Sequence, residues 1–164
     1  MTYRHLCTTA LLLLSLLIFA TTALAGSRTY YESGKVKTEY ITETGQKPIL
    51  KTFQENGKIH SIITYSGDQP ERALWHDENG VLQSEELYVD ASTRIVTFYD
   101  LVGNKITEET RVDGKRIKGR TFFPNGNTEK EYNFKDDKLN GPYILYFENG
   151  KIKAEFEYKD GVQI

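Results

Sequence analysis

The chain has 164 residues, 27% of them charged, and a formal net charge of −2 at pH 7. Such a weakly acidic chain lacks the strong positive field that holds phosphates, so nucleic acid is not expected as a partner. The single cysteine, Cys7, lies near the N-terminus, so the rest of the chain is predicted to be stable without disulfides.

Residues 1–25 have the pattern of a secretory signal peptide. Arg4 gives a positive start, residues 10–20 form an uncharged apolar run, and small residues precede a cleavage site after Ala25. The alternative is an uncleaved anchor, although the apolar run is short for a span of about 20 residues. We predict a mature chain of residues 26–164 that is secreted or periplasmic and has no transmembrane span.

Glycines recur through the predicted mature chain at a nearly constant interval of 23 residues, with one interval of 24. The six glycines are Gly34, Gly57, Gly80, Gly103, Gly126 and Gly150. Self-similarity at a fixed period is the signature of a repeat protein, in which each unit packs on its neighbours. We therefore predict six units that fill residues 26–164 as one repeat domain, without room for a second.

Each of these glycines is predicted to form a structural turn between two strands. Four of them follow asparagine, and Asn-Gly favours the type I′ turn because both central residues need positive φ. After the turn, apolar residues such as Ile152, Ala154 and Phe156 alternate with lysine and glutamate. Alternation with period two is typical of a half-buried strand.

The predicted fold is therefore all-β. We expect a repetitive antiparallel meander of about six β-hairpins with a 23-residue period, forming an elongated, twisted sheet of up to twelve strands. The small residues Thr38, Ser61, Ser84 and Ala154 recur two places after the first apolar position of a strand. They are expected to leave room for a large ring of the neighbouring hairpin.

Two units depart from the pattern. In the fourth unit, the spacing predicts one extra residue near Asn104, and we expect a bulge to restore the register. In the third unit, Glu86 falls on the face that carries apolar residues in the other units. We expect the regular packing to be poorest in this third unit.

The last unit resembles a known repeat. Its phrase consists of Asn140-Gly141, Tyr146-Phe147, Asn149-Gly150, Lys151, Ile152 and Gly161. This phrase is similar to the bacterial variant of the MORN repeat, found in many proteins labelled YwqK-type antitoxins. The resemblance covers four of the six units well. It implies a repeat scaffold that binds another protein, with an antitoxin-like or immunity-like role.

The mature chain shows no catalytic signature. Its histidines, His60 and His76, fall on a lysine-bearing strand face and beside a turn, which favours surface positions over metal ligands. The carboxylate pairs Glu108-Glu109 and Asp136-Asp137 consist of sequence neighbours, so on a strand they point to opposite faces. No nucleophile elbow, phosphate loop or zinc motif occurs. We expect no enzymatic activity, no bound metal and no cofactor.

Adjacent aromatic residues precede several of the turns. Successive strand residues face opposite ways, so one ring of each pair must leave the main packing face. The candidate binding residues are Tyr31, Tyr99, Phe122, Phe123, Tyr146 and Phe147. One interpretation is that these rings serve packing alone, because aromatics suit strands and cross-strand pairs. The other is that exposed rings bind a glycan, a peptide or the surface of a partner.

Two hypotheses of function follow. The first is a non-enzymatic secreted or periplasmic repeat protein that presents its sheet to another protein. The second is a module that binds carbohydrate or the cell envelope through the aromatic row. The full-length repeats and the missing catalytic groups favour the first, and an enzyme ranks third.

Overall fold

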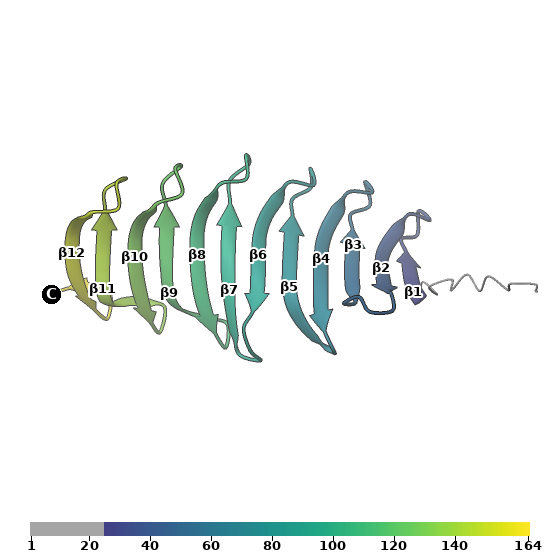
Figure 1. The fold of residues 1–164 in the computed structure, drawn as a ribbon, viewed down its shortest axis with the longest axis horizontal. Helices are drawn as coiled ribbons and strands as arrows, with labels where there is room; N and C mark the ends of the chain where they lie inside the picture. The colour runs from purple at the N-terminus through teal and green to yellow at the C-terminus, as the bar shows by residue number, and fades with distance from the viewer. Residues whose placement is uncertain (1–24) are drawn as a thin grey trace, which may run out of the picture.

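The protein forms one open, single-layer β-sheet. The structure, a computed structural model, describes residues 25–164. This part of the chain consists of thirteen strands and the turns between them, hydrogen-bonded in chain order and lying side by side along the long axis (Figure 1). The predicted signal segment lies outside the described residues, apart from Ala25. Within residues 25–164 no helix is long and apolar enough to cross a membrane.

The strands are short because two turns interrupt each repeat. Their bounds are β1 Ala25–Tyr30, β2 Val36–Thr42, β3 Ile49–Phe53, β4 Ile59–Ser66, β5 Gln69–His76, β6 Leu82–Tyr88, β7 Thr93–Tyr99, β8 Lys105–Val112, β9 Lys115–Phe122, β10 Thr128–Lys135, β11 Lys138–Tyr146, β12 Ile152–Lys159 and β13 Val162–Gln163. Each strand is antiparallel to the next. The predicted all-β meander of hairpin repeats is confirmed. The prediction of twelve strands is one too few, because a two-residue strand follows the last hairpin.

The six repeat glycines all lie in the turns drawn at the top of Figure 1, which we call the upper turns. The predicted type I′ geometry of these turns is wrong. Gly150 has a φ of 80°, but Asn149 is not among the residues with positive φ. The N–H of Gly150 donates to the carbonyl oxygen of Phe147 at 2.8 Å, and the N–H of Phe147 donates to that of Lys151 at 2.8 Å. These bonds define a type I turn closed by a left-handed glycine.

Asparagine recurs in the upper turns for a different reason from the one predicted. The Oδ1 atom of Asn149 accepts a hydrogen bond from the N–H of Lys151 at 3.0 Å, and Asn125 accepts from Asn127 at 2.9 Å. This side-chain bond to the backbone two residues on stabilises the turn without positive φ at asparagine. The connection is also longer than the two residues that a type I′ loop contains.

Type I′ turns occur instead at the opposite edge, in the lower turns. Three of these turns have positive φ at both central residues, and the pairs are Asp113-Gly114, Asp136-Asp137 and Asp160-Gly161. In the second of them only these two residues separate the paired strand ends, Lys135 and Lys138. A two-residue loop requires this geometry to match the twist of its strands.

The fourth unit is regular. Tyr99 pairs with Lys105 across a register shift, as Tyr30 pairs with Val36 in the first unit and Phe53 with Ile59 in the second. The predicted inserted residue at Asn104 is therefore wrong, and the bulge expected there is a feature of every repeat. Lys105 occupies the position that an apolar residue or a threonine occupies in the other units.

Cross-strand pairs form rows, with one residue from each of the strands β1 to β12, and the two faces of the sheet differ in chemistry. One face, which we call the packed face, carries the row Ser27, Tyr40, Leu50, Ile63, Ala73, Glu86, Val96, Glu109, Gly119, Tyr132, Tyr143 and Phe156. The other, the charged face, carries the row Arg28, Glu39, Lys51, Ile62, Leu74, Glu85, Thr97, Glu108, Arg120, Glu131, Ile144 and Glu155. The predicted alternation thus separates two faces of a single layer.

Burial is shallow because no second layer covers either face. Ala73 and Val96, 0% and 3% exposed, are the fully buried apolar residues of the described part. Glu86 lies opposite both of them and pairs with Arg94 at 3.3 Å. Packing is therefore not poorest around Glu86 of the third unit, contrary to the prediction, because arginine neutralises this carboxylate and both of its cross-strand partners are fully buried.

Small residues make room for large rings at two of the four predicted positions, whereas Thr38 lies opposite threonines and Ala154 lies opposite Leu145. Ser61 is fully buried opposite Trp75, and Ser84 lies between Trp75 and Phe98 on neighbouring strands. Alternating small and large side chains across strands lets the rings lie flat along the packed face. The repeats therefore interlock by side-chain size as well as by backbone hydrogen bonds.

Candidate functional site

The structure divides the six predicted binding residues into two groups of three. Tyr99, Phe122 and Tyr146 lie at the upper ends of β7, β9 and β11, and each contacts a side chain of the charged face. Tyr99 donates its hydroxyl to Glu85 at 2.8 Å, and Tyr146 donates to Glu131 at 3.0 Å. The guanidinium of Arg120 lies 5.2 Å from the ring centre of Phe122.

The other three residues begin upper turns. The hydroxyl of Tyr31 donates to the carbonyl oxygen of Phe53 at 2.6 Å, so this ring ties one turn to the next. Phe147 is 49% exposed, with Nζ of Lys153 at 5.8 Å from its ring centre, whereas Phe123 is half-buried. Phe147 is therefore the outward ring of its pair. The six rings do not gather into one continuous platform.

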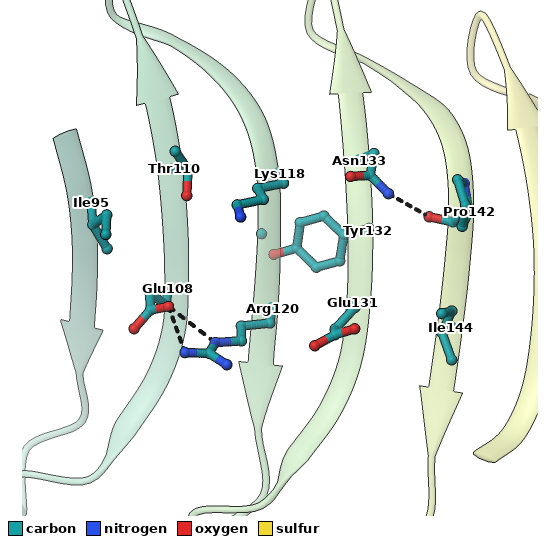
Figure 2. A pocket seen from close by; sticks show the side chains of 11 residues that line it. Ile95, Glu108, Thr110, Lys118, Arg120, Glu131, Tyr132, Asn133, Pro142 and Ile144 are labelled. Atoms are coloured by element: carbon teal, nitrogen blue, oxygen red, sulfur yellow. Dashed lines mark hydrogen bonds and ion pairs between the residues drawn. The ribbon is translucent and has the colours of Figure 1, made fainter. Parts of the chain in front are cut away.

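A hollow of about 320 Å³ lies on the C-terminal half of the sheet, spanning β7 to β11 (Figure 2). Its charged and polar lining consists of Glu108, Thr110, Lys118, Arg120, Glu131 and Asn133. Its apolar lining consists of Ile95, Pro142 and Ile144, with Gly119 and Tyr132 between the two sets. Most of these residues belong to the charged face. A second hollow of about 330 Å³ shares Glu131 and extends to Tyr146. We call the two hollows together the groove.

Packing behind the groove is tight at Gly119. A Cβ atom at this position would lie 2.6 Å from Cε2 of Tyr132, so only glycine fits beneath that ring. Tyr132 is itself held by Tyr143, stacked at 6.1 Å between ring centres, and by Phe134, edge-on at 5.4 Å. These rings form a cluster on the packed face that supports the strands under the groove.

Charges alternate across the groove. Arg120 is bound to Glu108 through Nη2 at 2.8 Å and Nε at 3.0 Å (Figure 2). Glu131, on the other side of Arg120, accepts the Tyr146 hydroxyl but has no cation within ion-pair distance among residues 25–164. Lys118 likewise has no carboxylate partner in the described chain. The groove therefore offers one free cation and one free anion beside apolar side chains.

No cluster of three or more His, Cys, Asp or Glu side chains suited to a metal ion occurs within residues 25–164. His60 packs edge-on against Trp75 at 5.8 Å. The carboxylates Glu108 and Glu109 fall on opposite faces, as their rows show.

Ionisation of the Tyr99 hydroxyl is expected to make the stability of the fold depend on pH. Burial and the hydrogen bond to Glu85 raise the pKa of Tyr99 to about 12. A folded pKa above the unfolded value of about 10 adds stability that is complete below pH 10 and is lost as the pH rises through 12. We expect the free energy of unfolding, measured in urea between pH 9 and pH 12, to decrease less with pH in Tyr99→Phe than in the wild type. In Glu85→Gln the tyrosine absorbance should rise at lower pH, and an unchanged titration would contradict this assignment.

Comparison with known families identifies the repeat. The family described as MORN repeat variant matches residues 27–42, 49–66, 72–90, 117–136 and 139–160, which together make up more than half of the chain. The chain belongs to this family. Each match contains one hairpin joined by an upper turn. The unmatched residues 91–116 contain β7 and β8, and the structure shows that these strands form the same hairpin as the other repeats.

No curated protein matches the chain. Two similar solved structures are both of TarM. One is a mutant TarM of S. aureus in complex with fondaparinux, alpha-GlcNAc-glycerol and UDP, 13% identical with a TM-score of 0.44 over 53% of this chain and 19% of that one. The other is TarM at 11% identity, with a TM-score of 0.49 over 64% of this chain and 21% of that one. The chain thus spans about a fifth of the length of these proteins.

Sequence reasoning missed the groove. Glu108, Arg120 and Glu131 become neighbours only through the register of β8, β9 and β10. The available signal was the position of each residue relative to its repeat glycine, which assigns all three to the lysine- and glutamate-bearing face. What this signal could not show is which charges pair and which stay free.

Proposed function

We propose that the protein is a non-enzymatic interaction scaffold that binds another protein through the groove. The observation that carries the proposal is the pair of free charges, Lys118 and Glu131, beside the apolar side chains of Pro142 and Ile144. Protein interfaces combine apolar contact with polar groups that fix orientation. Repeats of this family commonly mediate protein or membrane interactions, which agrees with such a role.

Rigidity supports the same proposal. The groove lies on strands that are paired on both sides, so binding does not require the backbone to become ordered, and this lowers the entropic cost of association. The partner we propose is a protein of the secreted or periplasmic space, the location predicted from residues 1–25. An antitoxin-like or immunity-like role is the form of this proposal that the repeat resemblance suggests.

Charge reversal in the groove tests the proposal. The wild-type protein and a Lys118→Glu, Glu131→Lys variant are used to capture partners from the envelope and secreted fractions of the producing cells. A control variant, Lys51→Glu, changes the charged face outside the groove. We expect one stoichiometric partner with the wild type and the control, and at least tenfold weaker binding with the reversal, about 1.4 kcal/mol.

Two results would contradict this proposal. One is the repeated absence of a stoichiometric partner, and the other is equal binding by the reversal variant. Binding to peptidoglycan or polysaccharide that is lost in the Phe123→Ala, Phe147→Ala variant would instead support the carbohydrate-binding alternative, which depends on exposed rings.

A further inference from the structure

Three arginines lie side by side on the packed face, near the lower turns. Arg94 of β7 is the cross-strand partner of Arg111 of β8, and Arg111 is the partner of Arg116 of β9. A register shift that leaves Ile117 unpaired brings Arg116 opposite Arg111. We call these three residues the arginine row. Like charges directly opposite each other destabilise a sheet, so the row needs compensating anions.

The carboxylates of the described chain neutralise the arginine row only in part. The buried Glu109 accepts hydrogen bonds from Nε and Nη2 of Arg111 at 2.9 and 2.6 Å, and its other oxygen lies 3.9 Å from Nη1 of Arg116. Glu86 faces Arg94 at 3.3 Å. Two carboxylates on the packed face thus serve three guanidiniums. A third, Asp137, lies 3.6 Å from Arg116, but its side chain is 65% exposed and is well screened by water.

Most donors of the row remain available. A guanidinium has five N–H donors. Within the described chain Arg94 uses Nη1 toward Glu86 and also contacts the Tyr88 hydroxyl. Arg111 uses Nε and Nη2 toward Glu109, which leaves most of the fifteen donors of the three guanidiniums unused. The guanidinium of Arg116 lies 4.4 Å from the ring centre of Phe134, which holds its plane. The three side chains are 29% to 38% exposed, so a ligand can reach them.

We propose that the arginine row binds the carboxylates of an acidic helix on a partner protein. Directly paired residues lie about 5 Å apart, so the row spans about 10 Å. Acidic residues at i, i+4 and i+7 of a helix follow the same spacing, with about 10.5 Å from first to last. Alternate residues of an extended strand are about 6.8 Å apart and fit less well. Guanidinium forks bind carboxylates with defined geometry.

The ends of the row favour the same ligand. Tyr88 is the cross-strand partner of Arg94, and the ring of Phe134 lies against Arg116. An amphipathic helix would place apolar residues over these two rings and its carboxylates over the arginines between them. This site lies on the opposite face of the sheet from Lys118 and Glu131 and uses different side chains, so it goes beyond the proposed function and does not depend on it.

Two alanine-based helical peptides of identical composition test the proposal by fluorescence anisotropy with the full protein. One carries glutamates at i, i+4 and i+7, and the other carries the same glutamates scattered around the helix. We expect the first peptide to bind at least tenfold more tightly, with an affinity that falls as salt rises. Equal binding of the two peptides would overturn the proposal.

Variants locate the site without removing the pair between Arg111 and Glu109. Arg94→Gln with Arg116→Gln should weaken the first peptide at least tenfold, whereas the control Lys51→Gln with Lys58→Gln, which removes the same charge outside both the row and the groove, should not. Arg116→Lys, which retains the charge but loses the fork, should weaken binding while the circular dichroism spectrum stays unchanged. Binding of heparin or phosphatidylserine vesicles, but of neither peptide, would also overturn the proposal.

Discussion

Replacing Gly119 with valine is expected to destabilise the protein by about 2 kcal/mol, because inserting atoms into a filled site forces its neighbours to move. A Cβ atom at this position would lie 2.6 Å from Cε2 and 3.0 Å from Cζ of Tyr132. The ring cannot turn aside freely, since Tyr143 and Phe134 hold it on either side. Urea unfolding should show a lower midpoint with an unchanged slope.

A double-mutant cycle separates this clash from other effects of valine. Tyr132→Ala removes the ring that a side chain at residue 119 would meet, so the cost of Gly119→Val should fall substantially in that background. The effect of valine on strand propensity is the same in both backgrounds and cancels. If Gly119→Val destabilised the wild type and Tyr132→Ala equally, or destabilised neither, the close contact between the glycine and the ring would be contradicted.

The period of the fold could be predicted from the sequence because backbone geometry enforces it. Every upper turn needs a residue with positive φ, which glycine supplies at no steric cost, so glycines such as Gly57 and Gly126 mark the repeat. The turn type could not be read from the same residues. Asn-Gly fits two geometries, and the length of the connection between the strands decides between them.

Charge placement was predictable only in part. Position relative to the repeat glycine was a signal that could have assigned Glu108 and Arg120 to the charged face, where they lie. The arginine row depends on the unpaired Ile117, and no local pattern around Arg116 indicates that bulge. Glu86 was misjudged because its neutralising partner, Arg94, becomes its neighbour only through the pairing of β6 with β7.

Removing one whole repeat is expected to leave a folded, shorter protein. Deleting residues 76–98 joins Trp75 to Tyr99 and removes 23 residues, so the strands that follow keep their phase. Each repeat contacts mainly its neighbours. The free energy of unfolding should therefore fall by the contribution of one repeat and of one interface between repeats. At 0.05 to 0.15 kcal/mol per residue this is about 2 kcal/mol. The slope of urea unfolding should fall in proportion to the surface removed.

A deletion of residues 76–97, one residue shorter, provides the control. The strand that then follows Trp75 is out of phase by one, so its packed and charged side chains exchange faces. Side chains of the charged face would then stand in the packed-face row that runs through Ala73. We expect this variant to unfold or aggregate, although it differs from the in-phase deletion by a single residue.

Small-angle X-ray scattering of the in-phase deletion tests the serial single-layer sheet most directly. Two strands contribute about 9.6 Å to the long axis, so the maximum dimension should shorten by that amount while the cross-section stays the same. A shortened, cooperatively unfolding particle is the result that we predict. An unfolded chain, or a folded particle of unchanged length, would show that the repeats are not independent units stacked in sequence.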